Sequence, residues 1–352
     1  MLPKRQQGMA LLTVLLLVVV ITVVAGSMLA SQKIALRKQM LLLDQNQILQ
    51  DIVAAEQIAA GLIAADMTLN NSDSMQDAWA QKPKPLQIGS HKVTLNIYDA
   101  SRKFNINNLY HDGAVDEAAL AAFQRLLSNV GLDPILAYAV LDWQDPDNET
   151  LAEGGAERDA YEAQDNKNSQ SVVASITNQP FISVDELAAV KGFTPAKLAT
   201  LKPYITAVPY YLPVNANTAD AVVLASLVEG GSAAQFAPLV KAVQTQPFDS
   251  LDNLMQTEGF AGLDEKAKAA VRPLLAVDSQ AFEVLIDVEV DAKHRYATTF
   301  ISKVAKTDAA NNGQADNQQP ANSGIGGNIG EQAAQRVIRP YNRKLWTYRP
   351  NL

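Results

Sequence analysis

The stretch that decides the fold is GMALLTVLLLVVVITVVAGSMLA, residues 8–30. From Met9 to Ala30 it runs for 22 residues without a charged side chain. As a helix this segment spans roughly 33 Å, enough to cross the hydrocarbon core of a bilayer, which is about 30 Å thick. Lys4 and Arg5 precede it. We therefore expect the N-terminus in the cytoplasm and the rest of the chain across the membrane.

The sequence beyond the apolar stretch continues in a helical pattern. Five apolar residues recur every seven positions: Ile34, Leu41, Ile48, Ala55 and Leu62. Leu42, Leu49 and Ile63 lie alongside them, and charged residues occupy other faces. No proline occurs between Pro3 and Pro83. The pattern predicts one continuous helix over 9–66, roughly 87 Å long. Its first half, 9–30, spans the membrane, and its second half, 31–66, is an amphipathic stalk.

A cleaved secretory signal is the main alternative for this segment. Such a signal has a shorter apolar core and small residues before its cleavage site, and residues 25–30 could provide that site. Two features favour a retained helix: a glycine precedes the apolar run, and the helical pattern continues beyond it. The alternative predicts a secreted cation-binding domain. N-terminal sequencing separates the two, because a mature start after Ala30 contradicts a retained anchor.

Composition excludes several classes of function. The formal net charge is −8 and the pI about 5.0, which argues against a primary role on nucleic acid. The chain has no cysteine and only three histidines, so disulfides and a histidine-rich metal centre are not expected. It contains no nucleophile elbow, phosphate loop or His-Glu-x-x-His motif. We therefore expect a protein that is not an enzyme.

Strand patterns flank a long helical block. Residues 91–98 alternate polar and apolar side chains, and 281–290 and 296–304 predict a second strand pair. Residues 113–279 between them have helical patterns throughout. The predicted fold class is α+β, with a long N-terminal helix, an antiparallel sheet and a large inserted all-α domain. The expected segments are 1–8, a leader; 9–30 and 31–66, the helix; 67–112, the first part of the head; 113–279, the insertion; and 280–352, the second part of the head.

The helical block contains an internal repeat. Gln179-Pro-Phe-Ile-Ser-Val-Asp-Glu-Leu187, with Gly192 following, recurs as Gln246-Pro-Phe-Asp-Ser-Leu-Asp-Asn-Leu254, with Gly259 following. Each copy predicts a serine-capped helix ended by glycine. Such units resemble helix-hairpin-helix or SAM-like modules. DNA-gripping hairpins usually have a second glycine two residues later, which is missing here, and the surroundings are acidic. We expect protein packing and no nucleic-acid partner.

The helical block also contains an acidic loop. Between Asp142 and Asp165 there are nine acidic residues and one basic residue, Arg158. Carboxylates at alternate positions in a Pro/Gly-rich loop can converge on one hard cation, which takes six to eight oxygens. The spacing is not that of an EF-hand. A solvated loop without a cation is the alternative.

The leader and helix resemble the class III signal sequences of type IV pilins and type II secretion pseudopilins. The resemblance implies that a prepilin peptidase cleaves between Gly8 and Met9 and that Met9 is N-methylated. The family usually has phenylalanine at the first mature position and glutamate at the fifth, where this chain has Thr13. The glutamate is thought to meet the terminal amine of a neighbouring subunit. Thr13 can instead bond a carbonyl one turn back in its own helix.

Loss of this glutamate, the large helical insertion and two Asn-x-Asn segments (105–107 and 215–217) resemble the minor pseudopilin K family. The resemblance implies a type IV pilin-like fold and a tip-capping subunit that starts the pseudopilus with minor pseudopilins I and J. Pseudopilin H, the major pseudopilin, inner-membrane lipid and secreted exoproteins are further expected partners. The implied location is the bacterial inner membrane, single-pass, with the head in the periplasm. The main rival is a minor pilin of a type IV pilus or competence system.

The acidic loop also resembles the calcium-binding loop of that family. The resemblance implies a structural calcium site whose candidate ligands, not all binding at once, are Asp142, Asp145, Asp147, Glu149, Glu153, Glu157 and Asp159. Near the C-terminus, residues 307–332 are rich in Asn, Gly, Gln and Ala and predict a mobile loop. Residues 337–348 are basic and aromatic, and predict either a last strand sealing the sheet or a partner contact.

Overall fold

A computed structural model describes residues 4–151, 153–165, 178–291, 293–305 and 336–350. The chain divides into two units, residues 1–54 and 55–352. The first unit contains most of helix α1 (Lys4–Met67). Every residue from Met9 to Gln47 is exposed, including the whole apolar stretch. Among the described residues this is the one helix long and apolar enough to span a membrane.

The last turns of α1 belong to the second unit and have a buried face. Ala55, Ala59 and Ile63 are buried, whereas Leu62 is 38% exposed. The predicted stripe is therefore wrong at Leu62. The buried positions Ala55, Ala59 and Ile63 are four residues apart, which is close to the 3.6 residues per turn of a straight helix. A strict heptad spacing would instead bury Leu62.

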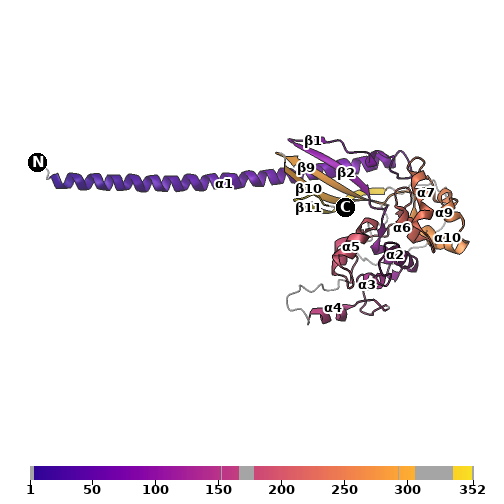
Figure 1. The fold of residues 1–352 in the computed structure, drawn as a ribbon. Coiled ribbons are helices and arrows are strands. Elements are labelled where there is room, and N and C mark those ends of the chain that lie inside the picture. The colour runs from indigo at the N-terminus through magenta and orange to yellow at the C-terminus, as the bar shows by residue number, and fades with distance from the viewer. Residues whose placement is uncertain (1–3, 152, 166–177, 292, 306–335, 351–352) are drawn as a thin grey trace, which may run out of the picture. The chain divides into compact units, whose positions relative to one another are not determined.

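The head contains a five-stranded antiparallel sheet in the order β1-β2-β9-β10-β11 (Figure 1). Its strands are β1 (Leu86–Ile88), β2 (His91–Asp99), β9 (Ala281–Val290), β10 (Lys293–Ala305) and β11 (Arg336–Trp346). The three predicted strands are confirmed, and the C-terminal segment is the edge strand β11. Apolar residues of β2 face those of β9, with Val93 opposite Val288 and Leu95 opposite Ile286. The predicted mobile loop at 307–332 lies outside the described residues.

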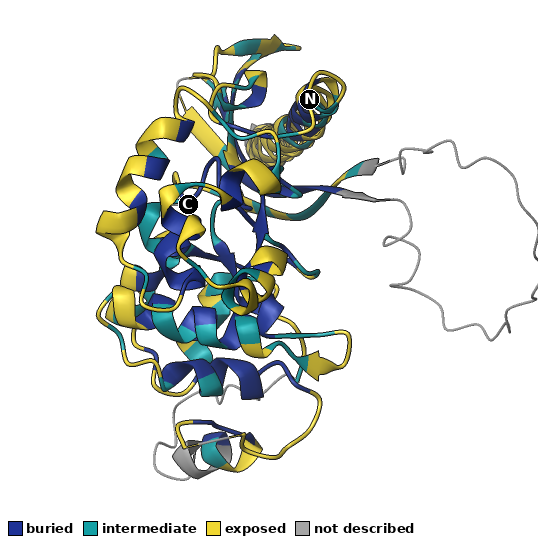
Figure 2. Ribbon diagram, turned by 90° about the vertical axis from the view of Figure 1, so that its right-hand side faces the viewer, coloured by how far each residue is buried: buried dark blue, intermediate teal, exposed yellow. Residues whose placement is uncertain are grey.

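The described residues between β2 and β9 form a largely helical module, and most of their buried apolar side chains belong to one core. Its helices of four or more residues are η2 (Ile106–Leu109), α2 (Glu117–Asn129), α3 (Leu136–Asp142), α4 (Arg158–Asp165), η3 (Val184–Ala189), α5 (Pro195–Leu201), α6 (Ala221–Leu227), α7 (Ala233–Val243), α8 (Leu251–Met255), α9 (Glu258–Ala261) and α10 (Glu265–Val271). Buried faces of these helices line the interior of the module (Figure 2).

Short elements complete the head. Three-residue 3-10 turns are η1 (Ala78–Ala80), η4 (Lys202–Tyr204) and η5 (Arg272–Leu274). Two-residue strands are β3 (Phe104–Asn105), β4 (Tyr110–His111), β5 (Ala114–Val115), β6 (Ile205–Thr206), β7 (Val214–Asn215) and β8 (Leu275–Ala276). The block is therefore not helical throughout. Its core also begins before position 113, since Phe104, Ile106 and Leu109 are buried in it.

The module has two halves built on one plan. In the first half β3 pairs in parallel with β6, and in the second β7 pairs in parallel with β8. In each half the second asparagine of the Asn-x-Asn segment bonds the phenylalanine of the Gln-Pro-Phe repeat. Phe181 N donates to Asn107 Oδ1 and Phe248 N donates to Asn217 Oδ1, both at 2.8 Å. These asparagines therefore have a structural role.

Candidate functional site

The N-terminal helix carries the first set of predicted functional residues. Thr13 Oγ1 donates to the carbonyl oxygens of Met9 (3.2 Å) and Ala10 (2.9 Å). Its hydroxyl is therefore satisfied inside its own helix, as the sequence predicts. Gly8 lies within α1, directly before Met9. Cleavage and methylation at this junction remain predictions from the resemblance.

The acidic loop carries the second set, and three of its seven candidates come together. Asp142 ends α3, Asp145 follows it in the next turn, and Glu157 immediately precedes α4. Each can offer one oxygen, and these oxygens lie within 4.8 Å of one another. All three residues are buried. Oxygens bound to one calcium ion, each at 2.3–2.6 Å, lie within about 5 Å of one another, so this spacing fits a shared cation.

The hydrogen bonds of the cluster leave several oxygens without a donor. Asp142 accepts from the backbone nitrogens of Leu151 (3.4 Å) and Ala156 (2.8 Å). Among the described residues, Asp145 Oδ1 and both carboxylate oxygens of Glu157 are buried with no hydrogen-bond partner. A buried carboxylate without donors is costly unless a proton or a cation neutralises it.

Burial also perturbs the acidity of the three groups. It raises the pKa of Asp145 to about 7, with Asp147, Asp142 and Glu157 adding to the rise. It raises the pKa of Glu157 to about 7, with Asp142 and Asp147 next in effect. Burial raises the pKa of Asp142 as well, against the bonds from Leu151 and Ala156. At neutral pH Asp145 and Glu157 are therefore near the middle of their titration, where a bound cation could replace their protons.

Local backbone geometry brings the loop back onto α3. Gly154 has φ +100°, and a Cβ there would lie 2.4 Å from Ile135 Cγ1. Only glycine fits this position. The turn at Gly154 places Ala156 where its nitrogen bonds Asp142. Trp143, next to Asp142, packs among aromatic side chains, with its ring centroid 5.6 Å from that of Tyr161 and 6.1 Å from that of Phe181.

The other four candidates lie at the surface. They are Asp147, Glu149, Glu153 and Asp159, all exposed. Asp147 remains near enough to raise the pKa of Asp145 and Glu157, and its Oδ1 accepts from Glu149 N at 2.8 Å.

Asn178 is a neighbour of the loop that sequence reasoning missed. Its Nδ2 donates to the carbonyl of Asp147 at 2.6 Å, and its Oδ1 is buried with no partner among the described residues. It has φ +48°, a conformation that asparagine tolerates better than most residues. Because it lies 31 positions from Asp147, only folding could associate the two.

The repeated hairpins have the predicted caps. Ser183 accepts from Asp185 N at the start of η3, and Ser250 accepts from Asn253 N at the start of α8. Gly192 has φ +88° after η3. The prediction fails at Gly259, which lies within α9 and does not end a helix. A Cβ at this position would lie 2.7 Å from the ring of Phe236. Close packing, and not helix termination, explains that glycine.

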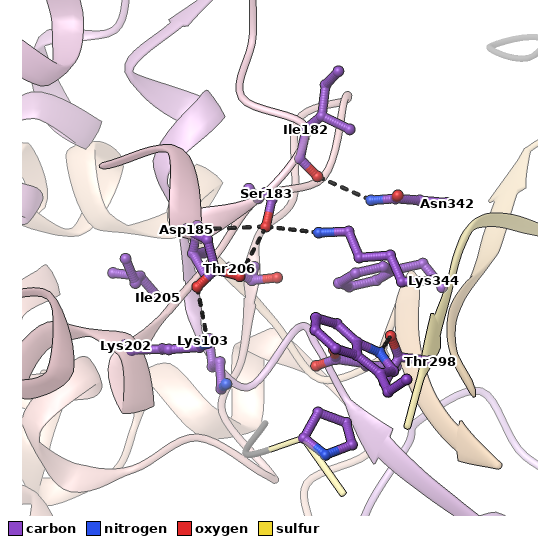
Figure 3. A pocket seen from close by; sticks show the side chains of 16 residues that line it. Lys103, Ile182, Ser183, Asp185, Lys202, Ile205, Thr206, Thr298, Asn342 and Lys344 are labelled. Carbon is purple, nitrogen blue, oxygen red and sulfur yellow. Dashed lines mark hydrogen bonds and ion pairs between the residues drawn. The ribbon is translucent and has the colours of Figure 1, made fainter. Parts of the chain in front are cut away.

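A cavity of about 80 Å³ lies in the seam between the module and the sheet (Figure 3). Two lysines of its lining have polar partners there: Lys202 Nζ lies 3.0 Å from Asp185 Oδ1, and Lys344 Nζ donates to Ser183 Oγ at 2.9 Å. Burial lowers the pKa of Lys103 and raises that of Glu283, and each opposes the shift of the other. This balance suits a polar seam between two parts of the head.

The antiparallel sheet, the large module inserted between β2 and β9 and an N-terminal helix apolar enough to serve as a membrane anchor define a pilin-like protein. Two family models, both described as type II secretion system protein K, match residues 102–210 and 214–278. The chain belongs to the type II secretion system protein K family, a family of minor pseudopilins.

Curated relatives agree with this assignment. Type II secretion system protein K of Klebsiella pneumoniae is 29% identical over 86% of this chain and 94% of the relative. The protein K of Pseudomonas aeruginosa is 26% identical over 85% of this chain and 89% of the relative. These relatives are secretion proteins, so the alternative of a type IV pilus or competence pilin gains no support from them.

A solved structure shows the same fold. A chain in the crystal structure of the GspK-GspI-GspJ complex from enterotoxigenic Escherichia coli superposes with a TM-score of 0.64. The match covers 74% of this chain and 92% of that chain, at 22% sequence identity. It confirms the pilin-like fold class predicted from sequence.

Proposed function

We propose that this chain caps the tip of a type II secretion pseudopilus and, with minor pseudopilins I and J, initiates its assembly for export of folded exoproteins. The observation that carries the proposal is Thr13, whose hydroxyl bonds Met9 and Ala10 in its own helix. A carboxylate at this depth in a bilayer costs several kcal/mol unless it is paired. A subunit with no neighbour above it has no amine to pair with such a group.

The inserted module supports the same role. In the chain it lies between Asp99 at the end of β2 and Ala281 at the start of β9. Its bulk would block addition of a further subunit above the head, so that growth from below pushes the tip outward. The role is structural and requires no catalysis.

The partners follow from the family and from the shared fold. The structural neighbour is a complex of GspK with GspI and GspJ. We propose the I and J pseudopilins as direct partners, with H and the major pseudopilin below them. A prepilin peptidase removes residues 1–8 and Met9 is methylated. The anchor then stays in inner-membrane lipid with the head in the periplasm.

The test places a carboxylate at the fifth mature position. In a strain carrying the complete secretion system, Thr13→Glu should reduce exoprotein in the medium at least tenfold, since the new carboxylate lacks a partner at the tip. Thr13→Val is the matched control, because it removes the hydroxyl without adding charge, and should secrete normally. Recovery of I and J with the detergent-solubilised chain measures assembly directly. Normal secretion by Thr13→Glu, or absence of I and J from the purified chain, would contradict the proposal.

We further propose that calcium binds Asp142, Asp145 and Glu157, with Asp147 and Asn178 as adjacent oxygen donors. The support is the set of buried carboxylate oxygens without donors. A bound calcium ion would neutralise them and tie the end of α3 to the segment before α4. The site would therefore be structural.

Calcium should raise the melting temperature of the full chain in detergent, and EDTA should lower it. Asp145→Asn combined with Glu157→Gln should remove most of the shift. The exposed Glu149→Gln and Asp159→Asn variants remove the same charge and should retain it. A melting curve unchanged by rigorous chelation and calcium addition would rule the loop site out.

A further inference from the structure

A second buried carboxylate cluster lies where α1 ends, outside the acidic loop. Asp66 is in the last turn of α1, and Asp73 and Asp77 follow in the segment before η1. Each can offer one oxygen, and these oxygens lie within 4.8 Å of one another. Asp66 and Asp73 are 4% and 1% exposed. The spacing again fits oxygens that share one hard cation.

Two of the three carboxylates accept hydrogen bonds, and one oxygen of the third has no partner. Asp73 Oδ2 contacts Lys303 Nζ at 2.5 Å and accepts from Ser279 N at 2.7 Å. Asp77 accepts from the backbone nitrogen and hydroxyl of Ser74. Asp66 Oδ2 is buried with no hydrogen-bond partner among the described residues. This buried oxygen is available to a cation.

The charges of the cluster do not balance. Lys303 is 3% exposed and offsets one of the three carboxylates, which leaves two negative charges when all are ionised. Burial raises the pKa of Asp66 to about 6, followed by the effects of Asp77 and Asp73, while Lys303 and the Trp79 indole oppose the rise. Asp66 is therefore mostly ionised at neutral pH. One divalent cation would balance the remaining charge.

We propose that Asp66, Asp73 and Asp77 bind one divalent cation of the calcium type. The ion would join the last turn of α1 to the loop after it, beside β10, from which Lys303 extends. It would stabilise the point where the stalk helix enters the head. This site shares no residue with the acidic loop, so it does not depend on the calcium proposal made above.

Isothermal titration of calcium into the EDTA-treated full chain in detergent, at pH 7.5, tests the proposal. In an Asp145→Asn/Glu157→Gln background, one calcium equivalent should remain. Adding Asp66→Asn, which preserves shape and removes the charge, should weaken that binding at least tenfold. Asp291→Asn is the matched control: Asp291 is exposed in the β9–β10 turn with φ +48°, which asparagine tolerates. It should leave binding unchanged.

Two results would overturn the proposal: no calcium binding to the background variant up to millimolar concentration, or binding that Asp66→Asn leaves unaltered. In the first case a proton would balance Asp66, and the loop proposal would stand if the unmutated chain still bound one equivalent. If the background variant fails to fold, Asp66→Asn is tested alone in the otherwise unmutated chain. It should then reduce the number of calcium ions bound per chain from two to one. An unchanged number would count equally against the site. Circular dichroism confirms folding of each variant.

Discussion

At the scale of single residues, the head contains several acids whose ionisation is opposed by their burial. Asp145 and Glu157 have pKa values raised to about 7, and Asp66 and Asp99 to about 6, in each case chiefly by burial. Asp99 is the best satisfied, since it accepts from Ser279 Oγ, Thr218 Oγ1, Asn215 Nδ2 and Ser101 N. The other three have oxygens without hydrogen-bond partners. We therefore expect these three carboxylates to respond most to pH and to calcium.

These shifts predict a pH dependence of stability. A carboxyl whose pKa is raised by folding stabilises the fold fully below its unfolded pKa of about 4, and this contribution is lost as pH rises through the folded pKa. In EDTA the melting temperature should therefore fall between about pH 4 and pH 7. Asp145→Asn/Glu157→Gln should flatten part of this fall, while Asp66, Asp99 and other buried acids contribute to the remainder.

Saturating calcium should reduce the same fall, because the ion binds the ionised carboxylates. Arg158 and Lys191 are the basic groups acting on the loop cluster, and both favour ionisation. Thermal unfolding followed by circular dichroism at several pH values measures the effect. A melting temperature in EDTA that rises from pH 5 to pH 7 would contradict the assignment.

At the scale of elements, one ion pair links α1 to the edge strand β11. Arg343 Nε donates to Glu56 Oε1 at 2.6 Å, and Arg343 Nη2 pairs with Glu56 Oε2. The Glu56 side chain is 1% exposed and that of Arg343 38%. Two parallel bonds from a guanidinium to a carboxylate fix orientation as well as contact. The C-terminal strand thereby holds the last turns of the N-terminal helix.

Arg343→Ala should destabilise the head because it leaves the Glu56 carboxylate buried and unpaired. The expected loss is about 2–3 kcal/mol, less than for a fully enclosed pair because Arg343 is partly exposed. Adding Glu56→Gln should recover part of it. Arg339→Ala, on an exposed position of the same strand, is the control and should cost little. Denaturant unfolding of the four proteins measures these differences, and a loss below 0.5 kcal/mol for Arg343→Ala would refute the link.

At the scale of the whole molecule, the inserted module is a duplication joined to the sheet through a buried polar network. Asn107 and Asn217 hold equivalent phenylalanines in the two halves. The two family models, covering 102–210 and 214–278, divide the module at the same point. At the junction, Asp99 from the end of β2 bonds Ser279, just before β9, at 2.6 Å. Both connections between module and sheet are therefore fixed at one place.

The sequence determined those features that depend on local order. The charge-free run from Met9 to Ala30 predicted an apolar helix, alternation in 91–98 and 281–290 predicted strands, and serines 183 and 250 predicted caps; each is found in the structure. These predictions succeed because periodicity and capping act over a few neighbouring residues.

Only the tertiary structure decided which of the acidic residues meet. Seven carboxylates in the loop looked equivalent in sequence, yet Asp142, Asp145 and Glu157 alone converge, because the turn at Gly154 folds Glu157 back against the end of α3. Asn178 and the cluster of Asp66, Asp73 and Asp77 were not anticipated. Their environment depends on residues as distant as Lys303, and long-range burial is not encoded in local spacing.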